Sequence, residues 1–113
     1  MSIQRIEPGA RMSQAVVHGD TVYLAGQVAE GATVVEQSRA ALQRVDELLA
    51  GVGSDRSKLL SVTIYLADIA TFADMNSVWD AWVDGANPPA RATVEAKLAT
   101  PDYFVEFAVT AAI

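Results

Sequence analysis

The chain contains the stretch Pro88-Pro89-Ala90-Arg91-Ala92-Thr93-Val94-Glu95, which decides how its second half folds. The two prolines fix the backbone φ angle and favour extended geometry around them, so the chain is expected to leave a turn here and enter a β-strand. From Arg91 onward the side chains alternate, with Arg91, Thr93, Glu95 and Lys97 on one face and Ala92, Val94, Ala96 and Leu98 on the other. The pattern predicts a strand over residues 91–98 that begins with an arginine.

Arg91 is the first candidate for a functional residue. A guanidinium group at the start of a strand is a planar, permanently charged fork that suits a carboxylate or a phosphate. An arginine that is merely solvated at the end of a strand is the commoner case. The residues of this stretch alone leave both interpretations open.

Two helices are predicted from apolar residues at helical spacing. The first runs from about Val34 to Ala50 and ends at the glycine-containing segment 51–53. The second follows Asp68, with Thr71 as its expected cap, and is broken by residues 85–89. The apolar stripes comprise Val34, Ser38, Ala41, Leu42, Val45, Leu48 and Leu49 in the first helix and Phe72, Met75, Trp79, Trp82 and Val83 in the second.

The other elements are expected to be strands. Residues 15–17 and 21–28 predict a β-hairpin around a turn at residues 18–20. The β-branched, apolar run of residues 59–66 is typical of an interior strand. A last strand is expected over residues 103–112. The order hairpin, helix, strand, helix, hairpin predicts one α+β domain over residues 1–113.

Three further residues attract attention on this scaffold. Gly26 lies inside a predicted strand, where glycine is unfavourable unless backbone, a bulge or a ligand must approach closely. Asn76 lies beside the aromatic stripe of the second helix and must satisfy its amide with a loop backbone or with a ligand. Glu106 lies on the more polar face of the last strand, opposite Val105 and Phe107, and is a candidate base. An exposed or cross-strand-paired glutamate is favoured at such a position.

Composition excludes several classes of function. The chain has 113 residues, of which 51% are hydrophobic and 19% charged, and surplus apolar surface of this kind favours a homo-oligomer. The net charge of −6 argues against a nucleic-acid partner. There is no cysteine, and His18 is the sole histidine, so neither a metal site nor a Ser-His-Asp triad is expected. Nothing resembles a signal peptide or a membrane span, so a cytoplasmic protein without membrane contact is expected.

Three segments, Val22–Gln27, Phe72–Asn76 and Pro89–Glu95, appear in the same order in a known family. The sequence resembles, over nearly its whole length, the YjgF/RidA family of reactive intermediate deaminases, also labelled endoribonuclease L-PSP or translation-inhibitor proteins. The resemblance implies a chorismate-mutase-like α+β fold, a mixed sheet with two helices on one face. It also implies a homotrimer with clefts between subunits.

The resemblance further implies a reaction and a set of site residues. A small carboxylated enamine of the 2-aminoacrylate type, or its imine tautomer such as 2-iminopropanoate or 2-iminobutanoate, is hydrolysed to a 2-oxo acid and ammonia without a metal or other cofactor. By the same resemblance Arg91 binds the substrate carboxylate with help from the backbone amide of Thr93. Gly26 turns its backbone to the substrate, and Asn76 is the asparagine of the cleft.

The chain departs from the deaminase pattern at two places. Near the C-terminus the family has two glutamates separated by one residue, the second of which positions the attacking water; Glu106 matches the first and Ala108 replaces the second. A substrate-contacting tyrosine of the family aligns with Met12, so the resemblance implies that Met12 and the nearby Gln14 contact the substrate. We expect the binding of the substrate carboxylate to be intact, and we expect Glu106 or backbone groups to position the attacking water.

The residues and the family resemblance leave three candidate functions. The first is an enamine/imine deaminase, and the second is a trimeric binder or sensor of 2-oxo acids that does not turn them over. Ala108 adds weight to the second. The third, ribonuclease activity, is opposed by the acidic charge and the isolated His18.

Overall fold

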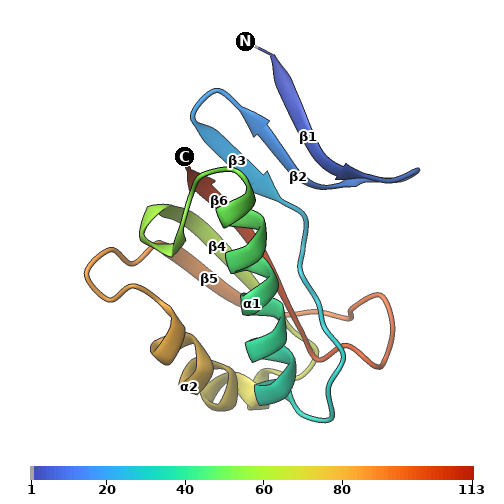
Figure 1. Cartoon of the computed structure of the whole chain (residues 1–113). Helices are drawn as coiled ribbons and strands as arrows, with labels where there is room; N and C mark the ends of the chain where they lie inside the picture. Colours follow the sequence, from blue (N-terminus) through green and yellow to red (C-terminus); the bar gives the residue numbers. More distant parts are fainter. Residues whose placement is uncertain (1) are drawn as a thin grey trace.

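A computed structural model describes residues 2–113 as a six-stranded sheet with two α-helices on one of its faces (Figure 1). Two short 3-10 turns, η1 (Arg56–Lys58) and η2 (Ile69–Thr71), precede β4 and α2 respectively. The strands and helices are β1 (Ile3–Pro8), β2 (Ser13–His18), β3 (Thr21–Leu24), α1 (Val34–Gly51), β4 (Leu59–Leu66), α2 (Phe72–Trp82), β5 (Ala90–Glu95) and β6 (Val105–Ala112).

The strand order across the sheet is β1-β2-β3-β6-β4-β5. β4 and β5 are parallel because α2 carries the chain back between them, and every other neighbouring pair is antiparallel. The expected hairpin between the last two strands is therefore wrong, since β6 lies between β3 and β4 and does not touch β5. β6 has a fully apolar face and is paired on both sides, whereas the proline-led and more polar β5 takes the edge.

The boundaries of β3 and β5 differ from those that the sequence predicts, whereas those of β4 agree. β4 spans residues 59–66 and is interior, as the sequence predicts. β3 ends at Leu24 and not at residue 28, although Gln27 still forms an isolated bridge with Phe107. β5 ends at Glu95 and not at residue 98. β1 was not expected, because its exposed side chains show no regular alternation.

The core lies between the sheet and the two helices. All seven residues of the predicted α1 stripe are buried, and so are Val105, Phe107, Val109 and Ala111 of β6. In α2 the buried residues are Met75, Val78, Trp79 and Trp82. Phe72 was expected in this apolar face but is 38% exposed, and its ring lies beside the guanidinium of Arg91 on β5. Val83 lies beyond the helix and is half-buried.

The start of α2 is built differently from the expected cap. Thr71 precedes the helix but makes no side-chain capping bond, and its hydroxyl donates to the carbonyl oxygen of Asp68. The Asp68 carboxylate instead accepts from Ala70 N and caps η2. Of the helices that residues 2–113 form, none combines the length and apolar character needed to cross a bilayer.

A buried amide joins α1 to two loops. Gln37 is fully buried, and its Nε2 donates to the carbonyl oxygens of Gly31 at 3.1 Å and Asp102 at 2.8 Å. Its Oε1 accepts from Phe104 N at 2.8 Å. These three bonds satisfy the buried Gln37 amide and fix the segments that follow β3 and precede β6.

Candidate functional site

Arg91 lies beside α2 on the helix-covered face of the sheet. Its partner in the parallel pair with β4 is the buried Val62, and paired residues share a face. Arg91 Nη1 donates to Asn76 Oδ1 at 2.7 Å. The guanidinium carbon lies 5.7 Å from the ring centre of Phe72 and 5.3 Å from that of Trp79, within cation–π range. Three side chains of one helix therefore hold the guanidinium.

The spacing of these three residues explains why they meet at Arg91. Phe72, Asn76 and Trp79 stand four and three residues apart and so share one face of α2. The Asn76 amide oxygen is satisfied by Arg91, not by a loop backbone. Within residues 2–113, Asn76 is the only group that accepts a hydrogen bond from Arg91, which leaves the other N–H groups of the fork for a ligand.

The backbone of β5 adds a second donor at the same place. Ala96 N donates to Leu66 O at 2.9 Å, and backbone groups alternate in direction along a strand, so the N–H groups of Arg91, Thr93 and Glu95 point away from β4. No strand of the described chain lies on that side of β5. The Thr93 N–H therefore lies on the open edge of the strand that carries Arg91.

Glu106 lies on the opposite face of the sheet, which neither helix covers. It alternates with the buried Val105 and Phe107 and pairs with Tyr65 of β4. A Cβ atom added to Gly26 would lie 2.2 Å from Glu106 Oε2. Only glycine therefore leaves room for the carboxylate, and this close approach of a side chain explains the glycine at position 26.

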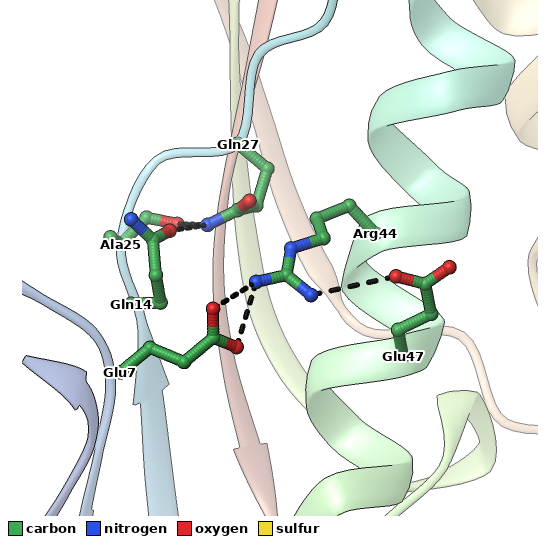
Figure 2. A network of polar contacts seen from close by, with 6 residues as sticks. All are labelled: Glu7, Gln14, Ala25, Gln27, Arg44 and Glu47. Carbon is green, nitrogen blue, oxygen red and sulfur yellow. Dashed lines mark hydrogen bonds and ion pairs between the residues drawn. The ribbon is translucent and has the colours of Figure 1, made fainter.

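Figure 2 shows how β2 is joined to the segment that carries Gly26. Gln27 Nε2 donates to Gln14 Oε1 at 3.1 Å. The backbone N–H and C=O of Gln27 bond to the backbone of Phe107 at 2.8 and 3.0 Å. Gln27 itself is buried. Gln14, Gly26 and Glu106 thus belong to one group of connected residues.

The end of β1, next to the turn into β2, is joined to α1 by an ion pair. Arg44 Nη2 donates to both carboxylate oxygens of Glu7, at 2.7 and 2.8 Å, and Nη1 lies 3.5 Å from Glu47 Oε2 (Figure 2). The hydrogen bond to Glu7 raises the pKa of Arg44 above its ordinary value. Gly9 N donates to Met12 O at 2.7 Å and closes the turn. Met12 is 51% exposed at this turn.

The site residues expected from the sequence thus fall into two groups within one chain. Arg91, Asn76 and Thr93 lie on the helix-covered face near the open edge of β5. Gly26 lies against Glu106 of β6, and Gln14 of β2 is joined to this place through Gln27. Met12 is exposed at the turn two residues before Gln14. The residues missed by the sequence analysis as parts of the site are Phe72, Trp79 and Gln27, although the helical spacing of the first two from Asn76 could have indicated them. The described residues contain no cluster of three or more His, Cys, Asp or Glu side chains placed to hold a metal ion.

A mixed six-stranded sheet with two helices on one face is the arrangement of a class of small α+β proteins. A crystal structure of a YjgF family member from Neisseria meningitidis matches the chain with a TM-score of 0.98 and 43% identity, covering 99% of this chain and 95% of that chain. A RutC family protein of Haemophilus influenzae is 46% identical over 114 residues, 98% of each chain, and the RutC family protein YoaB of Escherichia coli K12 is 44% identical over the full length of both. Residues 2–113 match the family described as Endoribonuclease L-PSP, and the chain belongs to this YjgF/RutC family. The resemblance noted in the sequence and the expected fold are confirmed.

Proposed function

We propose that the protein is an enamine/imine deaminase that acts on small carboxylated intermediates and binds their carboxylate at Arg91. The geometry of Arg91 supports this function most directly. Its guanidinium is held by Asn76 and two aromatic rings, and the Thr93 N–H shares the open edge of β5. A fork and a neighbouring amide together match the two oxygens of a carboxylate.

The proposed reaction is the addition of water to an imine carbon, followed by loss of ammonia. Glu106 takes a proton from water as the oxygen bonds to the carbon, and it returns this proton to the nitrogen to give an amino alcohol. The hydroxyl proton of the amino alcohol then passes to the nitrogen as the C–N bond breaks, the C=O bond forms and ammonia leaves. In total, the imine and one water molecule give a 2-oxo acid and ammonia, and nothing is oxidised or reduced. Proton transfer by a positioned carboxylate is ordinary general base catalysis.

The proposed site requires more than one copy of the chain. Arg91 and Glu106 project from opposite faces of the same sheet, so they converge only where two chains meet. The face not covered by helices also displays Tyr23, 50% exposed, and Val94, 41% exposed. We therefore propose a homotrimer with its clefts between subunits. Sedimentation equilibrium that finds a stable monomer at micromolar concentration would remove both the assembly and the shared site.

Replacing Arg91 tests the carboxylate grip. Loss of one partner of a desolvated, hydrogen-bonded charge pair costs roughly 2–5 kcal/mol, and Arg91→Ala is expected to lose binding of 2-oxobutanoate on that scale. Arg91→Lys is expected to recover part of it, because lysine supplies a point charge without a fork. Calorimetry measures both, with Arg39→Ala on the exposed face of α1 as the control. Unchanged affinity in Arg91→Ala would falsify the assignment.

A second function is favoured by Ala108. It shares the open face with Glu106, two residues away, and leaves that position without a carboxylate. A trimer that binds 2-oxo acids without turning over imines fits this feature. An assay of 2-aminoacrylate, generated in place by a dehydratase and followed with and without the protein, separates the two functions.

A further inference from the structure

Arg91 is one end of a continuous series of four side chains that crosses the helical layer. Its guanidinium lies over Trp79 at 5.3 Å, and the ring centre of Trp79 lies 5.4 Å from that of Trp82. The guanidinium of Arg56 lies over Trp82 at 5.0 Å. Each arginine thus contacts one of two tryptophans that contact each other.

The far end of the series is fixed by hydrogen bonds to α1. Arg56 donates to Asp46 Oδ1 through Nε at 3.2 Å and to Asp46 Oδ2 through Nη2 at 2.6 Å. Its Nη1 donates to the carbonyl oxygen of Trp82 at 2.7 Å. Trp82 Nε1 donates to the same carboxylate, Asp46 Oδ2, at 3.0 Å. Asp46 therefore holds both the indole of Trp82 and the arginine that covers it.

These contacts leave Trp79 little freedom. Trp82 contacts one side of it, and Phe107 stacks against it with a centroid distance of 6.5 Å and an interplanar angle of 7°. The direction of its ring face sets where a guanidinium gains cation–π attraction. Trp82 is also the last residue of α2, and its carbonyl is one of those left without a helical partner, which Arg56 satisfies.

We propose that Asp46 and Arg56 are positioning residues for Arg91, acting through Trp82 and Trp79. Neither of them touches the ligand. They hold the last turn of α2 and the tryptophan pair, so that the guanidinium of Arg91 keeps the orientation in which its free N–H groups meet a carboxylate. This assignment rests on the proposed function of Arg91 and extends it to a pair of residues on the other side of α2.

The chain provides a matched control for this proposal. Asp46 and Glu47 are neighbours on α1, and each pairs with an arginine, but only Asp46 bonds to α2. Asp46→Asn and Glu47→Gln each replace a carboxylate with its amide at nearly constant volume. A general effect of removing an ion pair from α1 appears in both variants, whereas an effect transmitted through α2 appears only in the first.

The experiment has one readout that needs no ligand and one that does. In nitrogen-15 NMR the Arg91 Nε–Hε signal is expected to shift in Asp46→Asn and to stay in place in Glu47→Gln. Affinity for 2-oxobutanoate at a temperature well below melting is expected to fall roughly 3- to 30-fold in Asp46→Asn, the range seen for residues that couple through packed side chains. In an Arg91→Ala background the same change is expected to have no further effect on affinity.

The outcomes separate the two proposals. If the wild type does not bind the probe, the proposed function fails, and the NMR signal of Arg91 still decides the positioning role. A lowered melting temperature in Asp46→Asn with an unmoved Arg91 signal would overturn the positioning role and leave Asp46 as a support of the fold alone. If Asp46→Asn does not fold, Arg56→Lys takes its place: it keeps the charge beside Asp46 but loses the fork that joins Asp46 to Trp82, and the same shift in the Arg91 signal is expected.

Discussion

Gly26→Ala is expected to displace the Glu106 carboxylate while leaving the fold intact. The added Cβ would lie 2.2 Å from Glu106 Oε2 and 2.7 Å from its Cδ, whereas ordinary contacts begin at 3.4 Å, so the oxygen must withdraw by about 1.2 Å. Gly26 is not among the residues with positive φ, so alanine can adopt its backbone conformation. The perturbation therefore acts on one side chain.

The expected magnitudes differ for stability and for turnover. Glu106 can turn away, because the clash involves the far end of a flexible side chain, and an off-rotamer carboxylate costs only about 0.5–1.5 kcal/mol. A catalytic group displaced by about 1 Å, in contrast, can lose roughly 100-fold in rate. The variant is thus expected to melt close to the wild type and to turn over 2-aminoacrylate about a hundred times more slowly.

The assay follows 2-aminoacrylate disappearance for the wild type, Gly26→Ala, Glu106→Gln and the double variant. Gly85→Ala is the control, since a Cβ there meets nothing within 4 Å. The double variant is expected to be no slower than Glu106→Gln alone, because both changes remove the same group from its position. If Gly26→Ala turned over 2-aminoacrylate at the wild-type rate, the role of Glu106 would be refuted. If the Gly26→Ala change slowed the Glu106→Gln variant as much as it slows the wild type, Gly26 would act by another route.

Two further predictions concern a buried amide and the missing carboxylate. Gln37→Leu is expected to lower the free energy of unfolding by about 2–4 kcal/mol, because three hydrogen bonds between its side chain and the backbone of two loops are lost. Urea denaturation measures the change, and Gln43→Leu on the exposed face of α1 should alter the free energy of unfolding by less than about 0.5 kcal/mol. Ala108→Glu is expected to raise imine turnover, within the roughly 10²–10⁴-fold that a positioned base contributes. A fall in melting temperature without a gain in turnover would show instead that the surroundings have closed around alanine.

The parts of the fold that the sequence predicts best are those with a strong local period. The α1 stripe from Val34 to Leu49 and the alternation of β6 each give one buried face, and both are buried as expected. The position of β6 between β3 and β4 depends instead on pairings between residues far apart in the chain, which no local period contains. β1 was missed for a related reason: as an exposed edge strand it needs no apolar face.

In the candidate site too, local patterns predict some features, and others depend on pairings between distant strands. The proline-led strand and the family resemblance both indicated Arg91, and the helical position of Asn76 allowed a partner to be expected there. Alternation within β5 and within β6 shows which residues share a face, but it does not say which face of the common sheet each set occupies. That Arg91 and Glu106 project to opposite faces follows only from the pairing of both strands with β4.

The open edge of β5 has a consequence for behaviour at high concentration. Unpaired N–H and C=O groups along an edge can accept a strand from another molecule, which is how edge-to-edge aggregation begins. This chain limits the length of that template: Pro88 and Pro89 precede it and offer no N–H, and the charged side chains of Arg91, Glu95 and Lys97 interrupt or follow it. Replacing the prolines would lengthen the exposed edge, and a strand from another molecule would then have a longer template to pair with.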